Sequence, residues 1–128
     1  MKPIRSAERI VLNVFATLYR SFGAEGIAYE GLSHLPLDDT RPVGTGFHVI
    51  RMEAGSISTP HEHTADEMFY VLDGELIDND GTRYGKGDMV LLRKGTQHSS
   101  RTPDGCMLLV YVETIETPVG GLKRIGCE

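Results

Sequence analysis

The second half of the chain consists of short runs that are rich in apolar residues. Such runs lie at 47–52, 67–77, 89–92 and 106–112, and glycines separate most of them. Short apolar runs that are bounded by turn residues predict strands. Short strands divided by glycine turns are typical of a β-sandwich or β-barrel. The pattern therefore predicts an all-β domain.

A tight turn is predicted at Asn79-Asp80-Gly81. Asn, Asp and Gly tolerate the positive φ angles that a two-residue hairpin turn requires. The turn should join residues 74–77 to residues 82–84 as a β-hairpin.

The segment 6–22 fits two patterns. As a helix it would begin at Ser6 and stop at Gly23, and its apolar residues follow the helical repeat. The same segment is rich in β-branched and aromatic residues, and alternate positions from 10 to 18 are apolar, as in a strand. Helix is the preferred interpretation, and a strand that pairs with a partner subunit stays open. The apolar positions are Ile10, Val11, Val14, Phe15, Leu18, Tyr19 and Phe22.

The segment 31–46 is rich in proline, glycine and aspartate, and it is predicted to be a loop. The expected organisation is a leader at 1–45 that packs on the barrel or on a partner, a barrel core at 46–114 and a tail at 115–128.

Composition narrows the function classes. The chain has 128 residues, enough for one core, and its 40% hydrophobic and 24% charged residues are ordinary for a globular domain. A net charge of −5 and the absence of a basic run exclude binding to nucleic acid by charge. No apolar run approaches the ~20 residues of a membrane span, and no cleavage site follows the N-terminus. Cys106 and Cys127 are too few for a disulfide scaffold, so we expect a cytoplasmic protein with no membrane partner.

The candidate chemistry lies at His61, His63, Glu67 and His98. Two histidines at i and i+2 point the same way from a strand, and Glu67 has the same parity. On a helix His61 and His63 would diverge by about 200°. The zinc-peptidase motif needs a second histidine at position 65, which is Ala65. One ion can collect His63 and Glu67 only if the chain bends between them, because an ideal strand would separate their Cα atoms by about 13 Å.

The segment Gly55-x5-His61-x-His63-x3-Glu67-x6-Gly74 resembles the first signature motif of the cupin superfamily at every fixed position. A second cupin motif, Gly-x5-Pro-x-Gly-x2-His-x3-Asn, resembles the segment 87–102, in which Arg93 replaces the proline and Thr102 the asparagine.

The resemblance implies a double-stranded β-helix (jelly-roll) barrel and a homodimer. It also implies one divalent transition metal per chain, Fe, Mn, Zn or Ni, held by His61, His63, Glu67 and His98, with Glu67 as a proton acceptor. The substitution at Arg93 predicts a less rigid turn before His98. His34 and His48 lack such companions, and a structural role is the preferred interpretation for each.

Parity extends the prediction to a pocket. If Glu67 faces the metal, every second residue after it faces inward, and the residues between them point outward and need cover. The inward side would present apolar walls and a few hydroxyls, which suits a small organic ligand, although these residues would serve equally well as barrel core. The candidate pocket residues are Phe69, Val71, Ser100, Thr102 and His48.

An open metal site can polarise a bound hydroxyl, enolate or carboxylate, and with iron it can bind O2. The preferred function is a dioxygenase-type enzyme for a small organic substrate. The segments around 74–87 and 103–110 resemble small bacterial cupins related to anti-sigma-factor sensory domains and to diketone dioxygenases. A non-catalytic metal-containing sensor or ligand-binding cupin, and a metal-dependent isomerase or decarboxylase, are the alternatives.

Overall fold

The computed structural model describes residues 1–24 and 27–119. These residues form ten strands and one short 3-10 helix, and they contain no α-helix. None of their helices is long or apolar enough to cross a membrane. The elements are η1 (Ser6–Glu8), β1 (Arg20–Ala24), β2 (Ile27–Pro36), β3 (Gly46–Met52), β4 (Ser56–Glu62), β5 (Glu67–Asp78), β6 (Arg83–Gly85), β7 (Met89–Leu92), β8 (Gln97–Thr102), β9 (Cys106–Val112) and β10 (Thr117–Pro118).

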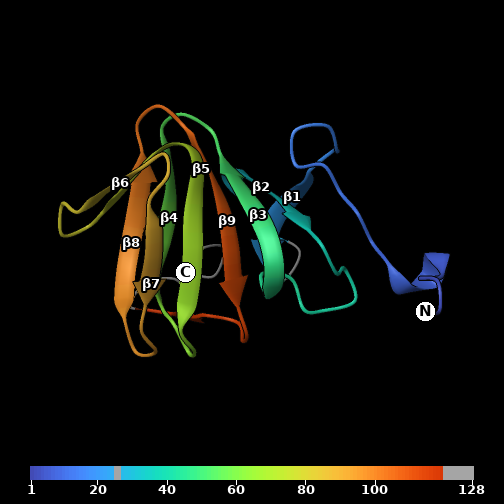
Figure 1. Ribbon diagram of the computed structural model, residues 1–128. Coiled ribbons are helices and arrows are strands. Elements are labelled where there is room, and N and C mark those ends of the chain that lie inside the picture. The colour runs from blue at the N-terminus through green and yellow to red at the C-terminus, as the bar shows by residue number, and fades with distance from the viewer. Residues whose placement is uncertain (25–26, 120–128) are drawn as a thin grey trace.

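The strands form one antiparallel sheet that curls into a jelly-roll barrel (Figure 1). Their order is β1-β2-β3-β9-β5-β8-β4-β10, and β6 and β7 also pair with β5. The central strand, β5, is twelve residues long and therefore reaches both walls of the barrel. Its first half pairs with β7 and β9, and its second half pairs with β6 and β8. The predicted all-β double-stranded β-helix is confirmed.

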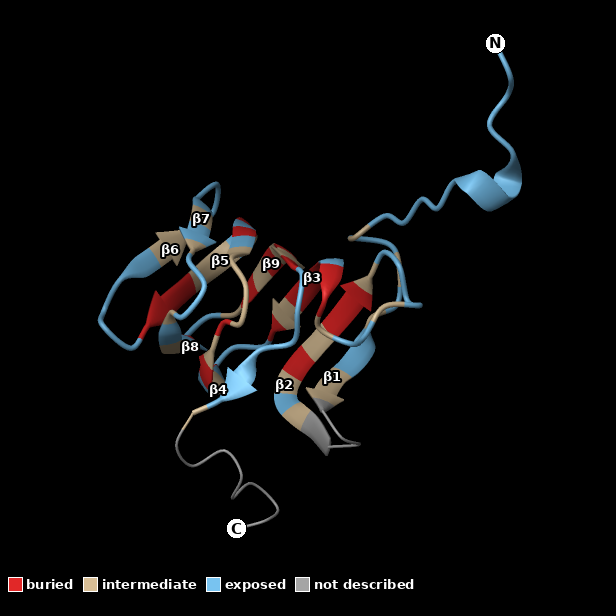
Figure 2. Cartoon of the chain, turned by 90° about the horizontal axis from the view of Figure 1, so that it is seen from below, coloured by how far each residue is buried: buried red, intermediate tan, exposed pale blue. Residues whose placement is uncertain are grey.

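The core occupies the inner face of this curled sheet, where buried residues run along β2, β3, β5 and β9 (Figure 2). Phe69 and Val71 are buried, whereas the alternate residues Met68 and Tyr70 are exposed, as the parity of β5 predicts. The core residues are Leu32, Ile50, Met52, Phe69, Val71, Leu76, Cys106, Leu108 and Val110.

The predicted helix at 6–22 is wrong. Only Ser6–Glu8 forms a turn of 3-10 helix, and β1 takes up the chain from Arg20 and pairs with β2 of the same molecule. Asn13 explains part of the failure, because its side-chain Oδ1 accepts a hydrogen bond from the Phe15 backbone N–H at 2.8 Å. Such a local bond offers the backbone an alternative to the helix, and the β-branched residues of the segment are weak helix formers.

The predicted loop at 31–46 is also wrong for its first six residues. They belong to β2, which pairs with β3 through partners such as Leu32 with Met52 and His34 with Ile50. Leu32 and His34 are buried at alternate positions, and Pro36 is the last residue of the strand. Proline is tolerated at a strand end because it breaks few ladder hydrogen bonds there. The composition of 31–46 therefore hid a strand.

Two local predictions are confirmed. The bend between His63 and Glu67 is present, since β4 ends at Glu62 and β5 begins at Glu67. The hairpin at Asn79-Asp80-Gly81 is present as the connection between β5 and β6.

Candidate metal centre

A β-bulge in β4 turns the first two histidines inward. Ser58 of β4 pairs with Ser100 of β8, and the next matched pair is His61 with His98. Three steps on β4 thus correspond to two on β8, so β4 carries one extra residue. The extra residue changes the parity of the strand. His61 and His98 become direct cross-strand neighbours, and His63 follows on the same side.

The bend after β4 is fastened to the turn before β8. The backbone N–H of His63 donates to the carbonyl of Thr96 at 3.0 Å, and the N–H of Gly95 donates to the carbonyl of His63 at 2.8 Å. Asp66 accepts a hydrogen bond from the Lys94 N–H at 2.8 Å and forms a salt bridge with Arg93 at 3.3 Å. The turn that lacks the usual proline is therefore held by hydrogen bonds to Asp66.

These connections bring three imidazoles together. Ligand atoms of His61, His63 and His98 all lie within 4.8 Å of one another, close enough to share a metal ion. The Nε2 atoms of His63 and His98 are 3.0 Å apart. Glu67 joins the group beside His63, with 3.2 Å between its Oε1 and His63 Nε2. The predicted residues thus converge at one place, with three histidines as the compact set and Glu67 at its edge.

Hydrogen bonds on the far sides of two rings orient their free nitrogens toward the centre. His61 donates its Nδ1–H to the carbonyl of Thr59 at 2.7 Å, and His98 donates its Nδ1–H to Asp78 at 3.0 Å. Both rings are then left with an Nε2 lone pair, which is the atom a metal binds. The third ring, His63, is 1% exposed, and its Nδ1 is buried with no hydrogen-bond partner among the described residues. Three imidazoles beside a carboxyl group fit a divalent transition metal.

Asp78, which the sequence did not single out, supports His98. It is buried at the end of β5 and also accepts hydrogen bonds from Ser100 Oγ and Tyr84 OH, both at 2.6 Å. Burial alone would raise the pKa of Asp78, but the hydrogen bonds from His98, Ser100 and Tyr84 outweigh it and hold the pKa below its usual value. The residue is therefore an ionised carboxylate behind a histidine. Because Asp78 directly precedes the turn Asn79-Asp80-Gly81, its sequence context suggests a turn residue rather than a functional one.

The charges of the cluster follow from its burial. Burial and the neighbouring His61 and His98 lower the pKa of His63 to about 4, so His63 is neutral, as a ligand must be. Burial lowers the pKa of His98, but the hydrogen bond and charge of Asp78 outweigh this and raise it. Burial, with a smaller contribution from the charge of Glu116, raises the pKa of Glu67 to about 8. A cation at the centre would stabilise the ionised form of the Glu67 carboxyl group and so lower its pKa.

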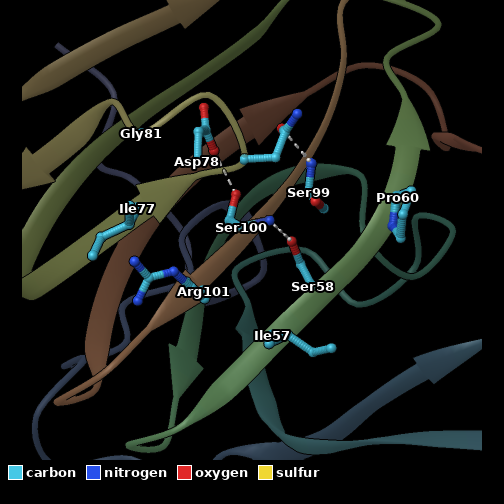
Figure 3. Close-up of a pocket in the computed structure, with 10 residues that line it drawn as sticks. Ile57, Ser58, Pro60, Ile77, Asp78, Gly81, Ser99, Ser100 and Arg101 are labelled. Atoms are coloured by element: carbon cyan, nitrogen blue, oxygen red, sulfur yellow. Dashed lines mark hydrogen bonds between the residues drawn. The ribbon is translucent and has the colours of Figure 1, made fainter.

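The predicted pocket residues occupy different surroundings. Phe69 and Val71 belong to the core, and Thr102 donates its hydroxyl to the carbonyl of Glu75 at 2.6 Å. His48 is buried, with its Nδ1 3.0 Å from the carbonyl of Gly46. Ser100 lines a hollow of about 360 Å³ beside β4, β5 and β8 (Figure 3). The other residues that line this hollow are Ile57, Ser58, Pro60, Ile77, Asp78, Asn79, Gly81, Ser99 and Arg101.

The jelly-roll barrel and the inward cluster of three histidines define the chain as a cupin with a candidate metal site. Residues 9–116 match the family model of the ChrR cupin-like domain, and the chain belongs to this family. No curated protein sequence matches it.

Solved structures share the fold at low sequence identity. A putative acetylacetone dioxygenase from Methylibium petroleiphilum PM1 superposes with a TM-score of 0.71 at 13% identity, over 94% of this chain and 85% of the other. The polyketide cyclase RemF from Streptomyces resistomycificus gives a TM-score of 0.60 at 20% identity, over 94% and 86%. The complex of Rhodobacter sphaeroides SigE with the anti-sigma ChrR gives 0.59 at 20% identity, over 82% of this chain and 51% of that chain, so this protein spans about half of its length. At these identities the likeness establishes the fold.

Proposed function

We propose that this protein is a divalent-metal-dependent cupin that acts on a small organic molecule, with dioxygenase-type chemistry. The observation that carries the proposal is the orientation of His61 and His98. Each ring gives its Nδ1–H to an acceptor, the Thr59 carbonyl or Asp78, and so directs its Nε2 to the same point as His63. A histidine cluster with a merely structural role has no need for such oriented lone pairs.

His61, His63 and His98 would hold the metal, with Glu67 as the fourth ligand and one Fe, Mn, Zn or Ni ion per chain. A bound ion would supply Lewis-acid chemistry, and iron would add a place for O2. Around it, Asp78 fixes the ring of His98, and the bulge and the bend fix His61 and His63. Glu67, whose carboxyl group lies 3.2 Å from His63 Nε2, is the group placed to take a proton from a bound substrate.

A small, largely apolar ligand suits the inner wall better than a highly charged one. Phe69 and Val71 lie on the same strand as Glu67 and on its inward side, and Ser100 adds a hydroxyl. We include Thr102 and His48 in the proposed lining because both side chains are buried. The neighbouring structures named acetylacetone dioxygenase, together with the cyclase, supply the first substrates to test: enols, β-diketones and aromatic ketones.

A second candidate function is a metal-containing sensor or ligand-binding module without turnover. Membership of the ChrR cupin-like family favours it, because a structure in the same family of folds contains an anti-sigma factor bound to a sigma factor. Isomerase or decarboxylase chemistry is the further alternative, since the same ligands would hold Mn, Zn or Ni.

Two measurements distinguish these functions. Elemental analysis of protein purified without added metal should find about one transition-metal ion per chain, and the His63→Ala variant should lose it. Oxygen uptake by the Fe(II)-loaded protein with the enol and diketone panel should then show turnover that Glu67→Gln diminishes. A matched control is Glu62→Gln, because Glu62 bonds Gln97 at 2.8 Å and lies outside the cluster. Tight ligand binding with no oxygen uptake would favour the sensor, and a metal-free chain unaffected by added metal would contradict both.

We also infer that the protein acts in the cytoplasm as a homodimer. Cys106 is a buried free thiol, and burial raises the pKa of this thiol to about 11, which keeps it unreactive. Cys127 lies outside the described residues. Support for the dimer comes from the exposed Met68 and Tyr70 on the outer side of β5.

A further inference from the structure

The outer side of the sheet formed by β3, β9, β5 and β7 carries two apolar rows. The strand register places Phe47, Tyr111, Met68 and Leu91 in one row across the four strands, and Val49, Leu109, Tyr70 and Met89 in the next. We call this surface the outer apolar face. Neither row contains a charged residue. Five members are more than a third exposed: Phe47 at 47%, Met68 at 48%, Tyr70 at 38%, Met89 at 83% and Leu91 at 44%.

A second apolar surface lies on the N-terminal residues 1–18, which we call the arm. Figure 2 shows this stretch running away from the barrel to the N-terminus. Its structure is local, with an Arg5–Glu8 ion pair and a turn at Asn13. Beyond it, the ring of Tyr19 lies 3.9 Å from the guanidinium of Arg51 on β3. The exposed apolar residues of the arm are Ile4 at 61%, Ile10 at 61%, Val11 at 78%, Leu12 at 36%, Phe15 at 72% and Leu18 at 92%.

The arm and the rest of the chain carry opposite net charges. Residues 1–19 contain three basic side chains and one acidic side chain, whereas residues 20–128 contain ten basic and seventeen acidic ones. Exposed carboxylates border the outer apolar face at Asp73 on β5 and Asp88 before β7, and Glu113 after β9 pairs with Arg41 at 3.5 Å. A basic apolar arm thus complements an apolar face with an acidic border.

The arm is long enough to cross the outer apolar face. Eighteen extended residues span up to roughly 60 Å, and four strands about 4.8 Å apart are roughly 15–20 Å wide. The arm of one molecule can therefore cross the whole outer apolar face of another. A reciprocal exchange buries two such contacts, which brings the interface toward the ~1,200–2,000 Å² that stable dimers bury in total.

We propose that this protein forms an arm-exchanged homodimer, in which residues 1–18 of each copy pack across the outer apolar face of the other copy. The proposal specifies the surfaces of the expected dimer. It rests on the homodimer inferred above but not on the metal site, so it can fail while the proposed metal-dependent activity stands, and the reverse also holds.

The first test is the dimer dissociation constant, measured by analytical ultracentrifugation of the full chain over a range of concentrations. Phe15→Glu in the arm and Met89→Glu on the face should each weaken the dimer at least about 10-fold, since each places a charge in an apolar contact. Ile57→Glu is the matched control, because Ile57 is 61% exposed on β4, outside both surfaces, and its constant should stay within roughly threefold of the wild type. Circular dichroism of each variant verifies folding. A monomeric wild type, or a dimer that neither Phe15→Glu nor Met89→Glu weakens, would overturn the proposal.

The second test locates the arm. A photoreactive benzoylphenylalanine replaces Phe15, and equal amounts of light and ¹⁵N-labelled protein are mixed, equilibrated, irradiated and digested with trypsin. On the outer apolar face, Met68 and Tyr70 fall in the tryptic peptide 52–83 and Met89 and Leu91 in the peptide 87–93, and the opposite wall supplies the control peptide 95–101. We expect heavy-to-light cross-links from the arm to the first two peptides. Cross-links confined to single molecules would show that the arm covers its own barrel, and cross-links mainly to 95–101 would place it on the wrong wall; either result refutes the exchange.

Discussion

Asp78 shows how one buried carboxylate can set the state of a metal ligand. It accepts hydrogen bonds from His98, Ser100 and Tyr84, and the first of these leaves the Nε2 of His98 free. An asparagine at this position would keep the size of the side chain but offer a donor in place of one acceptor oxygen. The orientation and basicity of His98 would then change without the loss of a ligand.

We therefore expect Asp78→Asn to weaken metal binding by about 10–100-fold, measured by competition with a chromophoric chelator. Asp80→Asn is the control, because Asp80 lies in the adjacent turn and bonds the Thr82 N–H at 2.9 Å. Equal affinities for Asp78→Asn and the wild type would show that His98 needs no support from Asp78.

Glu67 predicts the pH dependence of the metal-free protein. Burial raises the pKa of Glu67 in the folded state to about 8, from its ordinary value of 4.5. The folded state keeps a proton between these two values that the unfolded state releases. The stabilisation is thus fully present at low pH and is lost as the pH rises through about 8.

Chemical unfolding in the presence of a chelator, from pH 5 to pH 9, tests this. The unfolding free energy of the wild type should fall relative to that of Glu67→Gln by up to about 1.4 kcal/mol per pH unit, and the difference should level off above about pH 8. Parallel curves for the two proteins would mean that the Glu67 carboxyl group is solvated rather than buried.

At the scale of a strand, Gly74 lets β5 change walls. Its φ is +79°, and a Cβ at this position would lie 2.0 Å from the carbonyl oxygen of Gly105. The pairing of β5 with β9 shifts between Val71 and Asp73, so Gly74 follows a bulge where the two backbones approach closely. Gly55 has a similar φ of +85° but no atom within 4 Å of its Cβ position.

The two glycines form a matched pair for substitution by alanine. Gly55→Ala should lower the unfolding free energy by about 1–2 kcal/mol, because only the left-handed conformation is strained. Gly74→Ala should lower it by about 2–5 kcal/mol, since the clash with Gly105 adds about 1–3 kcal/mol of overpacking. Urea denaturation measures both, and equal losses would show that β9 moves aside without cost.

For the whole molecule, a metal that binds the folded barrel must also stabilise it. The four candidate ligands lie on β4, in the bend after it, on β5 and on β8, and they meet only when the barrel is closed, so the unfolded chain cannot assemble the same site. At a free metal concentration 100 times the dissociation constant, the gain is about 2.7 kcal/mol. Differential scanning calorimetry should therefore show a higher melting temperature with Zn(II) or Mn(II), which a chelator reverses. A comparable rise in the melting temperature of the His63→Ala variant would show that the metal stabilises the protein by binding at another site.

The sequence predicts the barrel and the meeting of its histidines because both depend on local rules. Parity counted from Glu67 indicates which side of β5 is buried, and the spacing of His61, His63 and Glu67 permits one shared ion only on a bent strand. Asp78 could not be found in this way, because its contact with His98 joins two strands, β5 and β8, that are distant in the sequence. Its sequence neighbours also suggest that it is part of a turn. The prediction for the residues before Arg20 fails because their apolar pattern fits both a helix and a strand. Tertiary contacts, not the local pattern, determine which conformation such a segment adopts.

X-ray absorption spectroscopy of the protein loaded with one equivalent of Zn(II) tests the central claim most directly, because it counts the ligands of the bound ion. The account predicts multiple scattering from three imidazoles at about 2.0–2.1 Å together with oxygen ligands and no sulfur. In the Glu67→Gln variant the three imidazoles should remain while the oxygen shell changes. A spectrum with fewer than two imidazoles, or one unaltered by His63→Ala, would contradict a metal site built from His61, His63 and His98.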